Sequence, residues 1–423
     1  MKKAKIKIGI LGFGSRGVSL VQPLLDSGTD VEIKWIIDTD IKQSKFFFSH
    51  WFFNPDNENN KYCHPKVNFV KSFSEVDRNE IDALLLTASE KVRTDLFEEA
   101  LSFNVPVFME KALSNSLEGC NKILTAFRAK ADAKVFMGFN LRYNPLTEEV
   151  KKIIKRGDIG KPLFIHYLEK LREAHGASYY RRLSGRLEHE QGGMFITKSC
   201  HDFDLVNYLI DDRPEKIFAS CKKVLFGLGG ENARKNCHEC DRAFECEHEM
   251  TKVMNKREDL KYYNDLYIGE SPANSRGYVP DNCVYKESLL TDMNNLIAEY
   301  RGGLRLNYAQ ILFAAKPGRE IGIFGTHGSL QYNLNDQELK VNTRWNASEY
   351  NVKANNISGN HGGADPRIMK AFTDMVRSKG ESPSRIEDGA WALVMGYAGY
   401  RSSASETWVD VNEMAKEAGI KEK

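Results

Sequence analysis

The chain has 423 residues, 41% of them hydrophobic, and its 60 basic and 58 acidic side chains leave a formal net charge of +2. This length fits two or three domains with sizeable cores, and the balanced charge gives no electrostatic reason to expect nucleic acid or a membrane as a partner. No hydrophobic run is long enough to span a bilayer, and lysines interrupt the short stretch after Met1-Lys2-Lys3, so we expect no targeting segment and a cytoplasmic protein.

A glycine-rich turn follows the first predicted strand. Residues 6–11 change from alternating to fully apolar, which is typical of a strand entering a buried parallel sheet. The turn, residues 12–17, reads Gly-Phe-Gly-Ser-Arg-Gly, and apolar residues then recur at helical spacing, with Pro23 expected to kink this helix. Such glycines permit a tight turn, the approach of a pyrophosphate and close packing of helix on strand, while the helix N-terminus offers free N–H groups to phosphates.

Asp38 closes the next apolar run, residues 31–37. A carboxylate at the end of the second strand can accept hydrogen bonds from ribose hydroxyls, and it repels a 2′-phosphate, so we expect NAD rather than NADP. The alternative is a plain strand–turn–helix unit whose glycines serve only packing. The complete order of strand, turn, helix, strand and acid favours dinucleotide binding.

Strands and helices alternate through the rest of the first third. Strands are predicted at 67–70, 81–87, 105–109 and 134–139, and helices at 94–103 and 117–131. This order predicts a Rossmann domain at residues 1–140, with a doubly wound parallel sheet. Residues 46–65, rich in aromatic residues and Asn, are expected to form an insertion or an elaborated loop.

The pattern changes after residue 140. Helices are predicted at 146–155, 195–210, 366–378 and 389–403, and strands at 161–171, 296–300, 304–313, 320–324, 329–334 and 338–341. The later strands are joined by short turns, as in an antiparallel meander. We therefore expect an α+β domain at 141–423 built on a large, mostly antiparallel sheet. One uncovered sheet face would favour a homodimer or homotetramer.

Two groups of residues could carry chemistry. Glu110 and Lys111 follow a buried strand at the carboxyl end of the parallel sheet, where ligands bind in this architecture and a lysine can polarise a substrate oxygen. Lys198, His201 and Asp204 are spaced three apart on a predicted helix, so they share a face and could form an acid/base relay. Taken singly, each is also explained as a solvated charge pair or an ordinary helix-face histidine.

The motifs together resemble a known family. Their order is the glycine turn with Asp38, then Met109-Glu110-Lys111, then residues 138–145 (Gly-Phe-Asn-Leu-Arg-Tyr-Asn-Pro), then Gly-Gly followed by His201-Asp-Phe-Asp. The chain resembles the glucose-fructose oxidoreductase / inositol dehydrogenase / MocA family of NAD(P)-dependent sugar and cyclitol oxidoreductases over nearly its whole length. The resemblance extends to residues 325–330 and to His361-Gly-Gly-Ala-Asp.

The resemblance implies roles for individual residues. His201 would be the catalytic acid/base, Lys111 would hydrogen-bond the substrate hydroxyl and the nicotinamide ribose, and Lys198 could take part in the proton relay. Arg142 and Tyr143 would face the substrate or shape the domain junction. The residues expected to contact the cofactor are Gly12, Phe13, Gly14, Ser15, Arg16, Gly17, Asp38, Thr87, Glu110, Lys111, Asn140 and Arg142.

This sequence departs from the family pattern in two places. Ala112 replaces the proline of the Glu-Lys-Pro signature, which could loosen the turn that aims Lys111. Thr197 stands where many members carry an acid four residues before the histidine, which leaves the proton relay and the choice of substrate carbon open.

The implied activity is hydride transfer between a secondary hydroxyl of a sugar, sugar derivative or cyclitol and nicotinamide. An alternative is a glycosidase or lyase that oxidises its substrate to a transient 3-keto sugar, eliminates the aglycone and then reduces again with the same NAD. A protein that senses NAD(H) or a sugar without turnover is a third reading, which Lys111 and His201 together argue against.

A polar insertion at about residues 229–283 carries four of the eight cysteines. Cys237 and Cys240 form a CxxC pair that could present two thiolates to one metal ion, and Cys246 and Cys283 could complete a tetrahedral site, with zinc favoured over an iron–sulfur cluster. A long loop with little apolar content needs a stabilising cross-link, and a bound metal can supply it. The cysteine spacing therefore predicts a structural metal site. The alternative is a set of reduced, unpaired thiols on a mobile flap.

Overall fold

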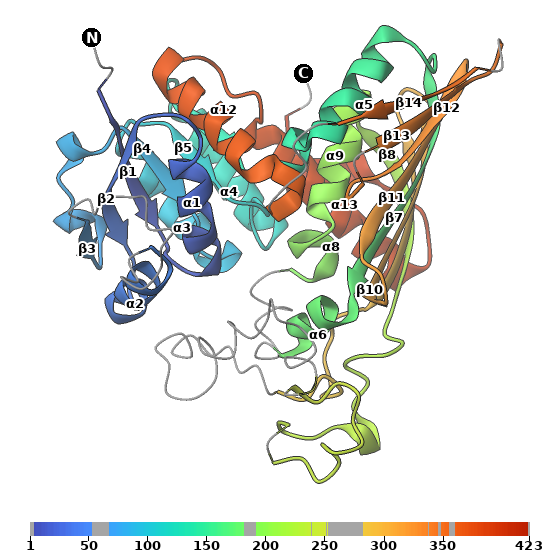
Figure 1. The fold of residues 1–423 in the computed structure, drawn as a ribbon, viewed down its shortest axis with the longest axis horizontal. Coiled ribbons are helices and arrows are strands. Elements are labelled where there is room, and N and C mark those ends of the chain that lie inside the picture. Colours follow the sequence, from blue (N-terminus) through green and yellow to red (C-terminus); the bar gives the residue numbers. More distant parts are fainter. Residues whose placement is uncertain are drawn as a thin grey trace.

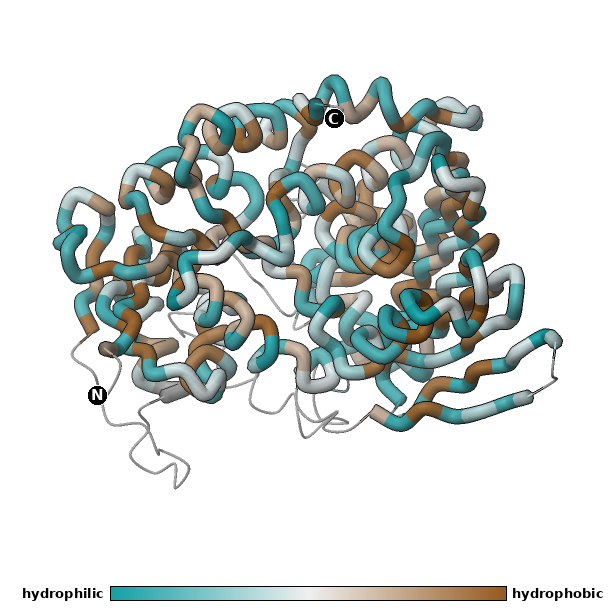
Figure 2. Tube along the Cα trace, turned by 90° about the horizontal axis from the view of Figure 1, so that it is seen from above, coloured by the Kyte–Doolittle hydropathy of each residue, from teal (hydrophilic) through white to brown (hydrophobic). Residues whose placement is uncertain are grey.

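The computed structural model describes residues 4–52, 67–181, 192–237, 239–250, 252, 282–336, 338–345, 348–354 and 360–421. Two sheets organise these residues, one in each half of the chain (Figure 1). Along the helices, hydrophobic and hydrophilic residues alternate, as expected for helices with one buried face (Figure 2).

The first sheet has six parallel strands in the order β3-β2-β1-β4-β5-β6. The strands are β1 (Ile6–Leu11), β2 (Val31–Ile37), β3 (Asn68–Val70), β4 (Ala83–Leu86), β5 (Val107–Met109) and β6 (Val135–Met137). The connecting helices are α1 (Ser15–Leu25), α2 (Ile41–Phe52), α3 (Glu90–Leu101) and α4 (Leu117–Arg128). The predicted Rossmann sheet is confirmed. Its strand order reverses between β1 and β4, and ligands bind at such a switch point.

The structure differs from two local predictions for this half. The aromatic stretch predicted as a loop begins in helix, because α2 continues through Phe52 and buries Phe47 and Phe48; residues 53–66 lie outside the described part. Pro23 falls in the last turn of α1, which ends at Leu25, so its missing N–H affects only the end of the helix.

The second sheet has nine strands in the order β14-β13-β12-β11-β7-β10-β9-β8-β15. They are β7 (Pro162–Arg172), β8 (Pro214–Lys222), β9 (Met293–Tyr300), β10 (Arg305–Ala314), β11 (Gly318–Gly325), β12 (Gly328–Asn333), β13 (Glu338–Thr343), β14 (Glu349–Lys353) and β15 (Val409–Asp410). The expected antiparallel pairing is confirmed except at the centre, where β7 lies between β10 and β11 and runs parallel to β10. Strand β7, which precedes the meander in sequence, therefore separates β10 from β11.

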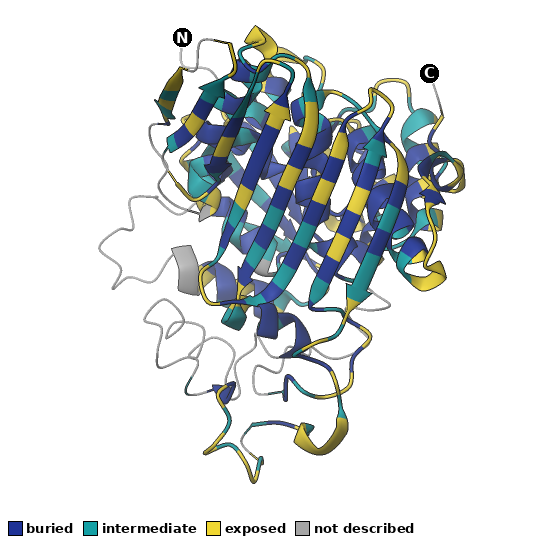
Figure 3. Ribbon diagram, turned by 90° about the vertical axis from the view of Figure 1, so that its right-hand side faces the viewer, coloured by how far each residue is buried: buried dark blue, intermediate teal, exposed yellow. Residues whose placement is uncertain are grey.

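Helices cover one face of this sheet. They are α5 (Pro145–Arg156), α6 (Glu173–Arg181), α8 (Met194–Thr197), α9 (Cys200–Ile210), α13 (Ile386–Ser405) and α14 (Val411–Glu417). Along the strands, buried residues alternate with exposed or half-buried ones, so the other face of the sheet is open (Figure 3). The single helix predicted at 195–210 is broken at Lys198 and Ser199. Among the described residues, no helix is long and apolar enough to cross a membrane.

A helix from the last third of the chain packs against the Rossmann half. Helix α12 (Ala364–Ser378) places Ile368, Met369, Phe372 and Met375 in the same hydrophobic cluster as strand β1 and helix α1. The Phe372 ring lies 5.5 Å from that of Phe108. Residues 364–378 thus complete the core of the Rossmann half, although the predicted boundary at 140 assigns them to the second domain.

Candidate cofactor and active site

The glycine turn leaves no room for side chains at its first and last glycines. Gly12 has φ +84°, and a Cβ there would lie 2.6 Å from the backbone of Ala88. A Cβ on Gly17 would lie 2.6 Å from the carbonyl oxygen of Gly12, which also accepts a hydrogen bond from Thr87. The first turn of α1 therefore opens directly onto the carboxyl ends of β1 and β4, and its free N–H groups suit the pyrophosphate of a dinucleotide.

Asp38 connects the end of β2 with this turn by a hydrogen bond. It is buried, and its carboxylate accepts the N–H of Phe13 at 2.6 Å and that of Asp40 at 2.8 Å. The structure thus places the predicted acid beside the predicted turn.

Arg16 links the glycine turn to residues from three other segments. Its Nε donates to Glu110 Oε1 at 2.7 Å, and its Nη2 lies 3.5 Å from Asp365 Oδ1. Asn140 Nδ2 donates to the same Asp365 oxygen at 2.9 Å. Burial lowers the pKa of Arg16, but the two carboxylates outweigh it and raise that pKa. Arg16 thus contacts Glu110 directly and Asn140 through Asp365, which the sequence analysis named as part of a motif but without a role.

Lys111 reaches from the end of β5 to the second half of the molecule. Its Nζ donates to the carbonyl oxygen of Thr197, at the end of α8, at 2.8 Å. The Lys111–Ala112 peptide bond is cis, and Arg93 donates to the carbonyl oxygen of Ala112 and to that of Ala88. The turn is thus fixed by hydrogen bonds although alanine replaces the signature proline.

His201 lies in the first turn of α9, just beyond the break that follows Thr197. Its side chain is only 7% exposed, and its ring centroid lies 6.2 Å from that of Phe139. Within the described residues, its Nδ1 is buried without a hydrogen-bond partner. Burial, followed by the positive charges of Lys111 and Lys198, holds the pKa of His201 well below its usual value. The imidazole is therefore neutral near pH 7 and able to accept a proton.

Lys198 occupies the break itself and pairs with a buried acid rather than with Asp204. Its Nζ lies 3.7 Å from Glu169 Oε1 on β7, and Arg319 on β11 also pairs with Glu169. Burial would raise the pKa of Glu169, but Arg319 and Lys198 lower it to about 2. The sequence analysis did not identify Glu169. The available signal was that a charged residue occupies a position that alternation along β7 assigns to the buried face.

Asp202 completes this buried network. It accepts hydrogen bonds from Tyr167 at 2.7 Å and Tyr308 at 2.9 Å, and it pairs with Arg319 at 2.7 Å. Burial raises the pKa of Asp202 to about 7; Arg319 opposes this rise and Glu169 adds to it. The sheet thus fixes α9, and with it His201, through polar side chains of three strands.

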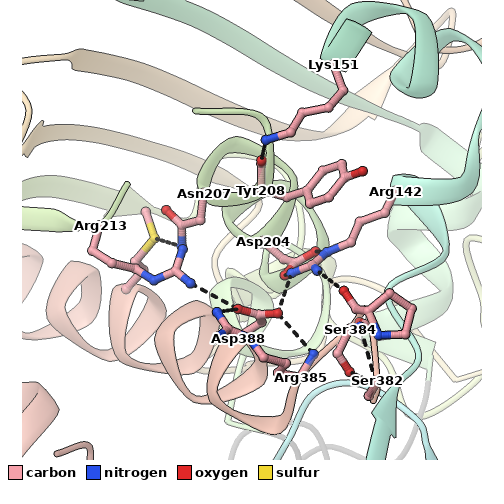
Figure 4. Close-up of polar contacts among 12 residues, drawn as sticks. Arg142, Lys151, Asp204, Asn207, Tyr208, Arg213, Ser382, Ser384, Arg385 and Asp388 are labelled. Atoms are coloured by element: carbon pink, nitrogen blue, oxygen red, sulfur yellow. Dashed lines mark hydrogen bonds and ion pairs between the residues drawn. The ribbon is translucent and has the colours of Figure 1, made fainter. Parts of the chain in front are cut away.

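Asp204 and Arg142 form a separate buried cluster (Figure 4). Arg142 Nε donates to Asp204 Oδ2 at 2.8 Å, its Nη1 donates to Pro383 O at 3.3 Å, and its Nη2 lies 3.1 Å from Asp388 Oδ2. Burial raises the pKa of Asp204 to about 6 in spite of this pairing. Asp204 is therefore paired with Arg142, and not with His201 as the helical spacing suggested. The guanidinium of Arg142 joins α9 and α13 through Asp204 and Asp388, and its contact with the cofactor stays a prediction.

The four cysteines of the insertion line one cavity of about 230 Å³. All four are free thiols. Burial raises the pKa of Cys246, and the other three thiols add to the rise. The sequence prediction that these residues come together is consistent with this cavity, but across the described residues no three His, Cys, Asp or Glu side chains are grouped tightly enough to hold a metal ion as they stand.

Profiles of one enzyme family match both halves of the chain. The NAD-binding Rossmann fold of the Gfo/Idh/MocA oxidoreductase family matches residues 6–139, and the C-terminal alpha/beta domain of that family matches residues 151–411. The chain belongs to this family. It is an NAD-binding oxidoreductase, as the resemblance in the sequence implied.

Relatives in sequence agree with this assignment. Over 95% of the chain and 97% of the relative, it is 25% identical to a Bacillus subtilis protein named "Putative oxidoreductase YteT". It is 27% identical to myo-inositol 2-dehydrogenase of Thermotoga maritima over 34% of the chain and 40% of the relative.

Solved structures of the family share the fold. A levoglucosan dehydrogenase in complex with NADH and levoglucosan is similar with a TM-score of 0.72 and 15% identity, covering 96% of this chain and all of that one. An oxidoreductase from Agrobacterium radiobacter in complex with NAD+, L-tartaric acid and magnesium has a TM-score of 0.67 at 16% identity, covering 97% and 100%.

Proposed function

We propose that this protein oxidises a secondary hydroxyl of a sugar, sugar derivative or cyclitol with NAD. The observation that carries the proposal is the hydrogen bond from Lys111 to the carbonyl oxygen of Thr197, next to the helix break that precedes His201. This contact brings an amine from the cofactor-binding half close to a neutral, buried imidazole. Relatives named inositol dehydrogenase and levoglucosan dehydrogenase support a polyhydroxylated substrate.

The residues divide the chemistry between them. When bound, NAD supplies the hydride acceptor, the C4 carbon of its nicotinamide ring. His201 accepts the hydroxyl proton as the hydride leaves the same carbon, which gives a ketone. Lys111 stabilises the negative charge that develops on the substrate oxygen. Lys198 adds positive charge nearby and is itself held by Glu169.

The test is NADH formation, followed by absorbance, on a panel of cyclitols, aldoses, anhydrosugars and sugar acids. We expect net NADH with at least one member and its loss in His201→Asn. If the purified protein binds NADH but oxidises no member of the panel, the proposal fails.

The redox-assisted glycosidase is the second candidate, because the Gly-Ser-Arg-Gly start (residues 14–17) and the His361-Gly-Gly segment resemble that branch of the family. It predicts release of the aglycone from an aryl glycoside without net NADH, and loss of that release when the cofactor is stripped. This outcome on the same enzyme preparation would replace the dehydrogenase assignment.

NAD is the proposed cofactor rather than NADP, because the buried Asp38 carboxylate would repel a 2′-phosphate. In Asp38→Ser, we expect the ratio of kcat/KM for NADP to that for NAD to rise at least about tenfold, the effect of losing one hydrogen bond to a charged group. Asp40→Ser removes the same charge two residues away and serves as the control. An equal change in both variants would contradict the assignment.

We also propose that the cavity lined by Cys237, Cys240, Cys246 and Cys283 takes up a structural zinc ion, its thiols moving together to coordinate it. Elemental analysis of the purified protein should find about one zinc per chain, the content of a four-thiolate site. We expect the double variant Cys237→Ser, Cys240→Ser to lose the zinc and Cys221→Ser to keep it. Trace metal only, or iron in place of zinc, would contradict the proposal.

A further inference from the structure

The segment before α12 holds a histidine in an unusual backbone conformation. His361 has φ +54°, and Gly362 and Gly363 follow with φ +64° and +80°. A residue other than glycine rarely adopts this left-handed region, and such residues concentrate at functional sites when their surroundings fix them. Here Asn144 Nδ2 donates to the His361 carbonyl oxygen at 3.4 Å, and the side chain is anchored as well.

Asp365 holds the ring of His361. The Nδ1 atom lies 2.9 Å from Asp365 Oδ2, and the aspartate side chain is only 2% exposed. Burial would raise the pKa of Asp365, but the hydrogen bond and charge of His361, followed by the charge of Arg16, lower it to about 2. The carboxylate is therefore ionised and accepts, so Nδ1 carries the proton. Nε2 is the second polar atom of the ring, on a side chain that is 39% exposed.

The same short segment of chain contacts His201 and the aspartate that holds His361. The 3-10 helix η3 (Asn140–Tyr143) begins with Asn140, whose Nδ2 donates to Asp365. The residue before it, Phe139, packs its ring edge-to-face on the ring of His201. In agreement with this placement, the charge of His361 contributes to the low pKa of His201.

Asp365 also faces the cofactor-binding turn. Its Oδ1 atom, the one that Asn140 contacts, lies 3.5 Å from Nη2 of Arg16. Arg16 stands between the glycines of the turn, and its Nε donates to Glu110. One carboxylate therefore connects the dinucleotide-binding turn to a half-exposed imidazole beside the catalytic histidine.

We propose that His361 is a further substrate-binding residue, whose Nε2 hydrogen-bonds a hydroxyl of the bound sugar or cyclitol. Asp365 is the positioning residue that orients this ring and couples it, through Arg16, to the dinucleotide-binding turn. This inference rests on the proposed function, because it assigns a group to a hydroxyl of that substrate.

The chain offers a matched variant. In His361→Asn, the side-chain amide can replace Nδ1 as the donor to Asp365, and asparagine tolerates a left-handed backbone better than most residues, but no atom remains at the position of Nε2. His327→Asn changes a second exposed turn histidine in the same way and serves as the control. Asp365→Asn removes the orienting charge without changing the shape.

The experiment measures binding rather than turnover. The fluorescence of bound NADH reports the Kd of the cofactor, and its change on adding each sugar or cyclitol of the panel reports the Kd of the ligand. We expect His361→Asn to keep the Kd of NADH within about twofold and to weaken the sugar at least about tenfold, the effect of losing one hydrogen bond. Asp365→Asn should weaken both ligands, since it acts on Arg16 as well, and His327→Asn should change neither.

The outcomes separate the two proposals. If the wild-type NADH complex binds no member of the panel, the proposed function fails, and the role of His361 with it. If the wild type binds a sugar and His361→Asn binds it equally well, or if His327→Asn weakens it equally, only the assignment of His361 is overturned. A matching thermal unfolding midpoint of wild type and His361→Asn excludes misfolding as the cause of weaker binding.

Discussion

A buried imidazole with positive charges around it has a consequence for the pH dependence of the reaction. The pKa of His201 is lowered by burial and by Lys111 and Lys198, so its basic form persists at pH values below the usual histidine range. A base must be unprotonated to act. Alcohol oxidation should therefore stay constant as the pH falls through about 6.5, the ordinary histidine pKa, and decline only at more acidic pH.

The measurement is kcat/KM for alcohol oxidation between pH 5 and 9. His201→Asn should lower kcat by about 100- to 10,000-fold, the usual contribution of a general base, and should abolish the acidic limb. Lys198→Met should move that limb toward higher pH, because one of the charges that lower the pKa is removed. A limb at or above the ordinary histidine value in the wild-type enzyme would contradict the assignment.

Sequence reasoning at this scale identified the residues but not all their partners. The glycine turn, Asp38, Glu110 and Lys111 follow strands, so the parallel sheet alone brings their side chains to one edge. The partners of Lys198 and His201 were not predictable in this way. Glu169 lies on a strand that is distant in sequence, and the identity of its contacts depends on the pairing of β7 with β10 and β11.

At the scale of elements, Arg142 connects η3 with α9 and α13 through Asp204 and Asp388. All three side chains are almost completely buried. Removing the cation would leave Asp204 buried without its paired arginine and Asp388 with one buried partner fewer, which is far more costly than losing an exposed pair.

Arg142→Met should therefore lower the free energy of unfolding by about 3–5 kcal/mol, the usual effect of breaking a buried ion pair. Arg385→Met is the matched control, because Arg385 is largely exposed and lies 3.6 Å from the same Asp388; we expect it to change the free energy by less than about 1 kcal/mol. Urea denaturation of both variants measures the difference, and similar losses would show that Arg142 has no special structural role.

Helices and strands were easier to predict than their arrangement. The periodicity of apolar residues located most elements, because each has one buried face. It did not reveal the break at Lys198 and Ser199, since apolar residues continue at helical spacing across it. The central place of β7 also depends on long-range pairing that no local pattern encodes.

The large sheet exposes apolar side chains on the face away from its helices. Phe164 and Phe324 lie side by side on the face away from the helices, with ring centroids 6.0 Å apart, and each is more than a third exposed. Ile297 on β9 is also exposed. We propose that this face pairs with a second copy of the chain, as a homodimer or a homotetramer.

Sedimentation velocity tests this proposal. The wild type should sediment as a dimer or tetramer, and Phe164→Glu should shift it toward the monomer, because a charge would be buried at the centre of the contact. Val224→Glu introduces the same charge at another exposed apolar position and should leave the assembly unchanged. A monomeric wild type would exclude the proposed pairing.

Helix α12 fills part of the Rossmann core, although it comes from the final sixty residues of the chain. A ribosome delivers the nucleotide-binding strands long before it delivers this helix, and N-terminal units generally fold first during synthesis. The emerging first half therefore keeps a hydrophobic gap beside α1 and β1, and a chaperone that recognises exposed apolar surface would find its target there until α12 has been synthesised.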